Sequence, residues 1–236
     1  MLIKLLLLSS LFSSLTFGYE IKVMEIDTGI SYTHDLIKSH INELDVLVNR
    51  ENYEDNYGHG THVAALIVKN TCPEVKLYSC KFYDTTHGDW DLEFNCLKRA
   101  YDEHFDFINF SGGGTDFSIN EYNALKKLST IPVTIVVAAG NMNPMTNKVI
   151  NLGNPCFGYF PACDYFPNLI TVGNLKEDGT ANLTSNYGMP GMVWEMGTAV
   201  WSAAPHNKMT YMTGTSMATA IHTNKLLKER CLEINK

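Results

Sequence analysis

Four polar residues of this sequence have the types needed for acyl transfer. Asp27 and Asn141 each follow an apolar segment, His59 lies between two glycines, and Ser216 precedes a run of alanine, methionine and threonine. Acyl transfer at neutral pH requires a nucleophile, a base, a group that fixes the tautomer of the base, and donors for the developing oxyanion. These four side chains could fill all of those roles.

Each motif also has a simpler structural interpretation. A serine before an apolar helix is most often a helix cap, an Asp-x-Gly after a strand is most often a turn, and a histidine beside glycine is often a loop residue. Short motifs of this kind have low specificity when they occur alone. Their joint occurrence in the order Asp, His, Ser favours a catalytic site.

The elements that must position these residues form an alternating pattern. Short apolar, β-branched segments alternate with helical patterns, which indicates βαβ units and a parallel sheet rather than a sandwich. The predicted strands are 21–26, 75–83, 106–111, 132–139 and 169–173, and the predicted helices are 59–69, 91–104, 119–129 and 215 to about 230. Because ligands bind outside the carboxyl ends of parallel strands, we expect Asp27, Asn141 and the segment 111–114 to meet at one edge of the sheet.

Several motifs, taken together, resemble those of the subtilisin-like serine proteases. The segments that carry the resemblance are VMEIDTGI, YGHGTHVAALI, VKLYSCKFYD, INFSGGG, IVVAAGN, GYFPACDYFPNLITVGN, SNYG and GTSMATA. Subtilisin itself has the chain order Asp, His, Ser. The similarity covers about residues 20–222 and implies an α/β, three-layer fold, with a mainly parallel, twisted sheet and helices on both faces.

The resemblance also implies a role for each candidate residue. Ser216 would be the nucleophile, His59 the general base and then acid, and Asp27 the group that orients His59. Asn141 and the backbone N–H of Ser216 would bind the oxyanion. No cofactor is implied for the chemistry.

The resemblance further implies a binding mode for a protein or peptide substrate. An extended peptide would pair with the backbone of Ser111, Gly112 and Gly113 as an added strand. The residues Ala138, Ala139 and Gly140 would form the other wall of the primary pocket, with its floor near Gly158. Because all of these residues are small, we expect a roomy apolar pocket that prefers Phe, Tyr, Leu or Met before the scissile bond.

Composition and the first residues indicate one exported domain. The chain has 236 residues, is 45% hydrophobic and carries a net charge of -7, without the basic cluster that a nucleic-acid partner would require. Residues 1–18 have the single charge, apolar run and neutral end of a secretory signal peptide. An uncleaved membrane anchor is the alternative, but polar residues interrupt the run before the roughly 20 residues of a span. We therefore expect a secreted, extracellular or periplasmic peptidase domain at 19–236, monomeric and without membrane contact.

The six cysteines of an exported chain are better suited to disulfides than to metal or redox chemistry, since no Cys-x-x-Cys pair occurs. Six cysteines allow 15 pairings. Cys156 with Cys163 and Cys72 with Cys80 are the pairs that proximity in sequence suggests. Buried free thiols are the alternative for each of them.

A metal site at His59, His62 and Asp27 is an alternative to the catalytic interpretation. The spacing His-Gly-Thr-His is not the His-Glu-x-x-His of zinc proteases, and the family has a structural histidine at the position of His62. The Asp- and Asn-rich segment 51–56 could bind calcium, as family members often do, but it has no recognisable calcium-loop spacing. We therefore predict no metal ligand and assign no calcium site.

The chain departs from the family pattern at two points. The first catalytic strand begins a few residues after the predicted signal cleavage point, so we expect no propeptide between them. Ala220 stands where the family has proline; alanine is a good helix former, so the helix should form with a less rigid first turn. These departures favour one alternative to an endopeptidase, a catalytically idle peptide-binding module, although the full set of catalytic residues weighs against it. An esterase or peptide ligase that uses the same serine is a further alternative, which differs only in substrate and acceptor.

Overall fold

The computed structural model describes residues 19–41, 54–83, 88–153 and 158–234, so the predicted signal peptide lies outside the described residues. In the described part of the chain, no helix is both long and apolar enough to cross a membrane. The elements in chain order are β1 (Ile21–Asp27), the 3-10 helix η1 (Lys38–His40), α1 (His59–Val68), β2 (Val75–Lys81), α2 (Trp90–Asp102), β3 (Phe107–Phe110), α3 (Ile119–Leu128), β4 (Thr134–Ala138), β5 (Leu169–Leu175), β6 (Val193–Met196), β7 (Val200–Ala204), β8 (Lys208–Met212) and α4 (Thr215–Ile234).

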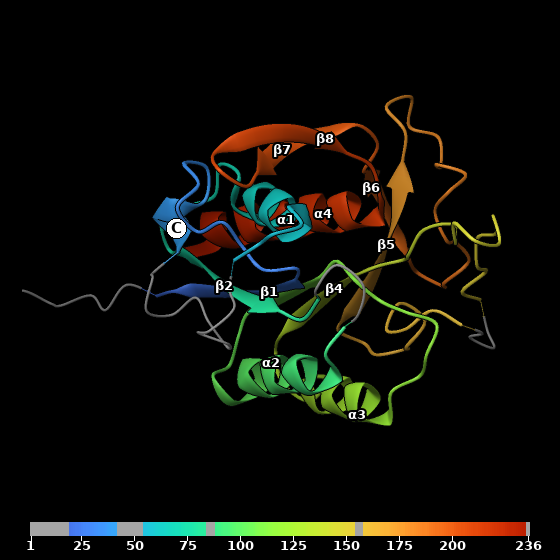
Figure 1. Ribbon diagram of the computed structural model, residues 1–236. Helices are drawn as coiled ribbons and strands as arrows, with labels where there is room; N and C mark the ends of the chain where they lie inside the picture. The colour runs from blue at the N-terminus through green and yellow to red at the C-terminus, as the bar shows by residue number, and fades with distance from the viewer. Residues whose placement is uncertain (1–18, 42–53, 84–87, 154–157, 235–236) are drawn as a thin grey trace, which may run out of the picture.

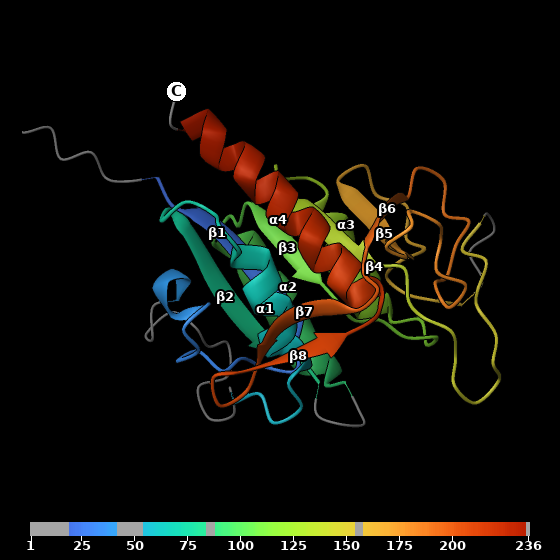
Figure 2. The same cartoon turned by 90° about the horizontal axis from the view of Figure 1, so that it is seen from above.

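Six strands form one parallel sheet in the order β2-β1-β3-β4-β5-β6. The helices α1 and α4 cover one face of this sheet, and α2 and α3 cover the other (Figure 1). The remaining strands, β7 and β8, pair as an antiparallel hairpin beside α1 and α4 (Figure 2). The predicted α/β architecture, with helices on both faces of a mainly parallel sheet, is confirmed.

Apolar side chains from the strands fill both interfaces of the sheet. Along β1, Ile21 and Val23 pack toward α1 and α4, whereas Met24 and Ile26 pack toward α2 and α3. All four side chains are fully buried. Strands that are buried on both faces have near-continuous apolar sequences, which is why the central strands could be predicted.

The predicted central elements agree with the structure to within three residues at each boundary, except that α4 extends to Ile234, four residues past the predicted end. The strands β6, β7 and β8 were not predicted. β8 is mostly exposed and has no buried residue, so it lacks a regular alternation of buried and exposed residues. His206 and Asn207 in the connecting turn have φ angles of 61° and 56°, the left-handed conformation that suits a tight hairpin.

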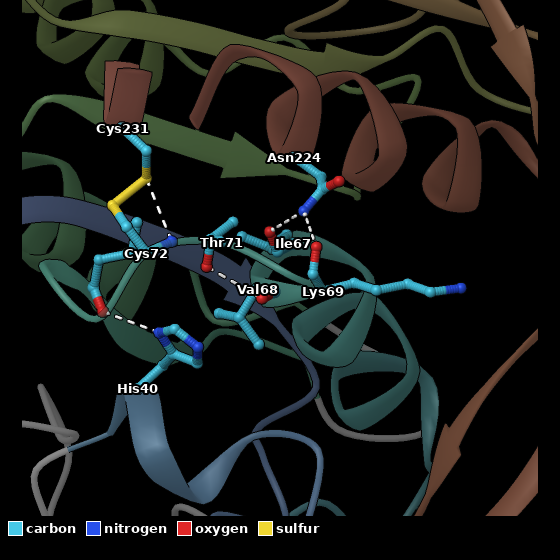
Figure 3. Close-up of a disulfide and its surroundings, with 9 residues drawn as sticks. His40, Ile67, Val68, Lys69, Thr71, Cys72, Asn224 and Cys231 are labelled. Atoms are coloured by element: carbon cyan, nitrogen blue, oxygen red, sulfur yellow. Dashed lines mark hydrogen bonds between the residues drawn. A yellow bond between two sulfur atoms is a disulfide. The ribbon is translucent and has the colours of Figure 1, made fainter. Parts of the chain in front are cut away.

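Two disulfides are formed between described residues. Cys72 is bonded to Cys231, with 5.8 Å between their Cα atoms, and Cys80 is bonded to Cys96, with a Cα separation of 6.1 Å. Figure 3 shows the first bond, which joins the segment after α1 to the end of α4. The predicted pairing of Cys156 with Cys163 involves Cys156, which lies outside the described residues.

The predicted pairing of Cys72 with Cys80 is wrong. Cys80 lies in β2, which starts at Val75 and runs away from Cys72. An extended strand rises about 3.3 Å per residue, so the five residues from Val75 to Cys80 span about 17 Å, well beyond the 4.4–6.8 Å Cα separation that a disulfide requires. Proximity in sequence was therefore misleading for this pair.

Candidate active site

Asp27 and His59 meet at the carboxyl end of β1. Oδ1 of Asp27 accepts a hydrogen bond from Nδ1 of His59 at 2.7 Å and another from the backbone N–H of Thr28 at 2.7 Å. The Asp27 side chain is 1% exposed, whereas the His59 side chain is 23% exposed. The carboxylate therefore holds the ring from inside the protein, and the other ring nitrogen is left toward the surface.

Gly58 and Gly60 allow the start of α1 to approach the end of β1. A methyl group added at Gly60 would collide with the carbonyl oxygen of Gly29 and would lie 3.2 Å from Oδ1 of Asp27. Gly58 is the N-cap of α1 and has a φ of 93°, a conformation that glycine adopts without steric cost. The small neighbours of His59 are thus required by the close packing of the two elements.

Asp55 and Thr28 hold the first turn of α1, and neither role was predicted from the sequence. Oδ2 of Asp55 accepts hydrogen bonds from the backbone N–H and the hydroxyl of Thr61, at 2.8 and 2.6 Å. Oγ1 of Thr28 accepts from the backbone N–H of Gly60 at 2.9 Å and donates to Oδ1 of Asp55 at 2.9 Å. These bonds satisfy backbone donors that a helix start leaves unpaired. The sequence signal that could have indicated the role of Asp55 is its position four residues before His59, at the predicted helix start.

Ser216 lies in the first turn of α4, beside the end of β3. Its Oγ donates a hydrogen bond to the carbonyl oxygen of Ser111 at 3.0 Å, and the residue is 7% exposed. Among the described residues, no hydrogen bond joins Ser216 to His59. The structure thus brings Ser216 to the predicted substrate strand, with its hydroxyl turned to that strand rather than to His59.

Asn141 is fixed to the same helix start through Thr215. Oδ1 of Asn141 accepts from the backbone N–H of Thr215 at 3.0 Å, and the backbone N–H of Gly140 donates to Oγ1 of Thr215 at 3.1 Å. Since the amide oxygen faces α4, Nδ2 of Asn141 remains as a donor. Asn141 itself is exposed. A donor and the positive end of a helix dipole are therefore placed together, which suits an anion.

A buried polar network behind the site was also missed. Nδ2 of Asn109 donates to Oγ of Ser111 at 2.9 Å, and Oγ of Ser111 donates to the carbonyl oxygen of Ser216 at 3.1 Å. The hydroxyl of Thr223 donates to Oδ1 of Asn109 at 2.9 Å. The network ties β3 to α4 and so fixes Ser111 and Ser216 relative to each other.

The charges around His59 favour its protonated form. Burial acts to lower the pKa of His59, but the charge and hydrogen bond of Asp27, together with the charge of Asp55, outweigh burial and raise that pKa. Glu25, two residues before Asp27, is fully buried. Burial and the charges of Asp27 and Asp55 hold the pKa of Glu25 well above its usual range, which favours its neutral form.

The glycines of the predicted substrate strand already have backbone partners. The backbone N–H of Gly113 donates to the hydroxyl of Tyr83 at 3.0 Å, and that hydroxyl donates to the carbonyl oxygen of Gly113 at 3.2 Å. Gly114 pairs with Phe160 through two backbone hydrogen bonds of 2.9 and 2.8 Å. An added strand would therefore have to displace the Tyr83 hydroxyl at Gly113.

The predicted primary pocket has small walls, and an aromatic ring lies between them. Methyl groups added at Gly113 and Gly140 would lie 2.7 and 2.5 Å from Cε1 of Tyr159, so the Tyr159 ring lies between the two walls. Ala138 and Ala139 are buried beside Gly140. Gly158, predicted as the floor, has a φ of 103° and open space on the side where a side chain would project. Among the described residues, the Tyr159 ring therefore occupies part of the space between the small walls.

His62 is held by the backbone rather than by a ligand set. It is fully buried, and its Nε2 lies 3.1 Å from the carbonyl oxygen of Val200. In the described ranges, no group of three or more His, Cys, Asp or Glu side chains is arranged to hold a metal ion.

Sequence comparisons agree with this geometry. Residues 18–228 match the model of the subtilase family. Subtilisin DY of Bacillus licheniformis is 30% identical over 212 residues, covering 86% of this chain and 73% of that protein. Subtilisin E of Bacillus subtilis (strain 168) is 28% identical over 211 residues, and thermitase of Thermoactinomyces vulgaris is 28% identical over 213 residues. The chain spans 53% of the length of subtilisin E and 72% of that of thermitase.

A solved structure shows a similar fold. A serine-to-alanine mutant of the protease domain of PatA superposes with a TM-score of 0.74 at 22% sequence identity, covering 94% of this chain and 84% of that one. At this identity the likeness supports the fold alone. The family match, by contrast, extends over most of the chain and includes the segments that carry Asp27, His59, Asn141 and Ser216. The chain therefore belongs to the subtilase family of serine endopeptidases.

Proposed function

We propose that this chain is a secreted endopeptidase that hydrolyses peptide bonds through an acyl-enzyme on Ser216. The observation that carries the proposal is the 2.7 Å hydrogen bond between Asp27 and His59, with His59 partly exposed. This bond fixes the ring so that Nε2 can accept a proton from the nucleophile. Asn141 and the backbone N–H of Ser216 bind the oxyanion of the tetrahedral intermediate.

Substrate binding prepares the nucleophile in this mechanism. Without substrate, the Ser111 carbonyl oxygen accepts a hydrogen bond from Ser216 Oγ at 3.0 Å. A peptide that pairs with the strand at Ser111 donates its own N–H to that carbonyl oxygen instead. The Ser216 hydroxyl is then free to turn toward His59. Hydrogen bonds between catalytic groups often tighten only in the substrate complex, so the resting position of Ser216 is compatible with activity.

Export is part of the proposal and has two supports. Residues 1–18 have the pattern of a signal peptide, and disulfides such as Cys72–Cys231 and Cys80–Cys96 persist mainly in oxidising compartments. A preference for large apolar residues before the scissile bond is not part of the proposal, because Tyr159 lies between the pocket walls.

A fluorophosphonate probe tests the proposed activity. The secreted, oxidised protein is expected to be labelled at Ser216, and the Ser216→Ala variant is expected to remain unlabelled with an unchanged circular dichroism spectrum. Absence of a Ser216-dependent label on folded protein would end the proposal and leave the idle peptide-binding module as the better account.

The value of kcat/KM is expected to rise with pH, and the midpoint of this rise should lie above the ordinary pKa of histidine. The base must be neutral to accept a proton, and the His59 pKa is raised because Asp27 and Asp55 outweigh the effect of burial. A plot of kcat/KM against pH should therefore have its acid midpoint above about 6.5. The residual activity of Asp27→Asn, measured with a reactive ester, should have a lower midpoint. A wild-type midpoint at or below 6.5 would contradict the raised pKa of His59.

Removing the Tyr83 hydroxyl is expected to improve substrate binding. Tyr83→Phe keeps the ring but frees both backbone groups of Gly113 for an added strand. A net hydrogen bond contributes about 0.5–1.5 kcal/mol, so KM for a long peptide should fall about two- to tenfold. A single-residue ester that does not reach Gly113 is the control, and its KM should not change. An unchanged or higher KM for the long peptide would show that the hydroxyl does not compete with substrate.

A further inference from the structure

The ring of Tyr159 is held at the place where a substrate side chain would enter. Methyl groups added at Gly140 would lie 2.5 Å from Cε1 and 2.6 Å from Cζ of this ring, and at Gly113 the corresponding distances are 2.7 and 3.1 Å. The φ angles of Gly113 and Gly140 are 152° and 88°. One ring edge thus contacts both walls at once, and each wall lacks a side chain where the ring passes.

The backbone around Tyr159 supports this placement. The backbone N–H groups of Phe160, the next residue, and of Gly114 each donate a hydrogen bond to the carbonyl oxygen of the other. The Tyr159 carbonyl oxygen accepts a hydrogen bond from the backbone N–H of Cys163 at 3.1 Å. The ring packs against the core that lies between the sheet and the helices α2 and α3. Burial raises the pKa of Tyr159 to about 12, so its hydroxyl is neutral at every pH at which the enzyme would work. An anchored backbone and a partly buried ring favour a fixed side chain.

The consequence for specificity follows from volume. In the proposed function, the side chain before the scissile bond enters between Ser111–Gly113 and Ala138–Gly140. A tyrosine ring that already lies between these walls occupies space that another aromatic ring or a leucine side chain would need. A small side chain needs less of the space between these two segments than an aromatic ring or a leucine does.

We propose that Tyr159 is the specificity-determining residue of the primary pocket and restricts cleavage to sites after Gly, Ala or Ser. This inference rests on the proposed function, because it concerns which peptide the Ser216 site accepts. It replaces the large apolar preference that the sequence alone suggests with the opposite preference.

Peptide anilides that differ only in the residue before the anilide test the proposal. The wild type is expected to hydrolyse the Ala substrate with a kcat/KM at least about tenfold above that of the Phe substrate, since pocket fit discriminates about 10–200-fold. Tyr159→Ala should raise the Phe-to-Ala ratio by about 10–100-fold. Tyr159→Phe is the matched control and should keep the wild-type order. Tyr159→Leu preserves apolar packing and is the second variant if Tyr159→Ala folds poorly. It should raise the Phe-to-Ala ratio of kcat/KM by less than Tyr159→Ala does.

Probe labelling separates the failure of this inference from the failure of the proposed function. If Ser216 is labelled but the wild type cleaves after Phe as readily as after Ala, the ring does not restrict the pocket and the inference is wrong. The inference is equally wrong if Tyr159→Ala and Tyr159→Leu are labelled yet keep the wild-type ratio. If the wild type is not labelled, the proposed function fails, and the inference fails with it.

Discussion

Replacing Ser216 by alanine should lower kcat by about 10⁶-fold, because the Ser216 hydroxyl supplies the oxygen of the acyl-enzyme in the proposed function. In subtilisin itself, loss of the serine or the histidine lowers kcat by about 2 × 10⁶-fold, and we expect a loss of similar size for Ser216→Ala. The fold should not change, since Ser216 Oγ makes a single hydrogen bond to Ser111 and alanine favours the helix. Stopped assays with a peptide anilide at high enzyme concentration measure the residual rate.

The double variant His59→Ala/Ser216→Ala is the sharper test. Groups that act as a unit are strongly non-additive, so the second substitution should cost almost nothing once the first is present. A residual 10³–10⁴-fold acceleration over water should survive in each variant, supplied by the oxyanion donors and by substrate binding. Additive losses in the double variant would mean that His59 does not act through Ser216. His62→Ala is unsuitable as a control, because His62 is buried and bonded to Val200.

Much of the fold and the outline of the site could be predicted because they depend on local patterns. β1 and β4 are buried on both faces, so their sequences are apolar throughout, and the polar residue after each of them marks the edge of the sheet. Asp27 and Asn141 were found in this way. His59 and Ser216 were found because glycine precedes each helix start within two residues.

What could not be predicted depends on contacts between distant parts of the chain. Tyr159 is an ordinary aromatic residue in sequence, and its position between Gly113 and Gly140 follows from where three separate segments meet. The same holds for Thr223 and Asn109, which are 114 residues apart. Spacing cannot identify disulfide partners, and Cys231 bonds a residue 159 positions away.

Replacing Cys72 and Cys231 together by alanine should lower the stability more than removing the Cys80–Cys96 bond. The bond closes a loop with a sequence separation of 159, against 16 for the Cys80–Cys96 bond. In the chain-entropy model, loops of these lengths stabilise by about 5 and about 3 kcal/mol respectively. For a domain of this size, 1 kcal/mol corresponds to about 2–4 °C in Tm. The Cys72/Cys231 variant should therefore melt about 10–20 °C below the parent.

Both double variants are best made in a Ser216→Ala background, so that self-cleavage does not distort the melting curves. Circular dichroism at matched protein concentration gives Tm for the parent, for Cys72→Ala/Cys231→Ala and for Cys80→Ala/Cys96→Ala. The second pair is the control, because it removes one disulfide of the same chemistry from a short loop. Cys80 and Cys96 are also fully buried. A larger loss for that pair would mean that packing around the bond outweighs loop closure.

The position of the Cys72–Cys231 bond separates its effect on stability from its effect on catalysis. His59 and Ser216 lie at the N-terminal ends of α1 and α4, whereas the bond lies beyond the C-terminal end of α1 and near that of α4. At 1.5 Å per residue, Ser216 and Cys231 are about 22 Å apart along the helix. Asn224 still joins the helices without the bond, donating to the carbonyl oxygens of Ile67 and Lys69 at 2.8 and 2.9 Å (Figure 3). With Ser216 intact, the variant should therefore keep the parent kcat well below its Tm and lose activity only as it unfolds.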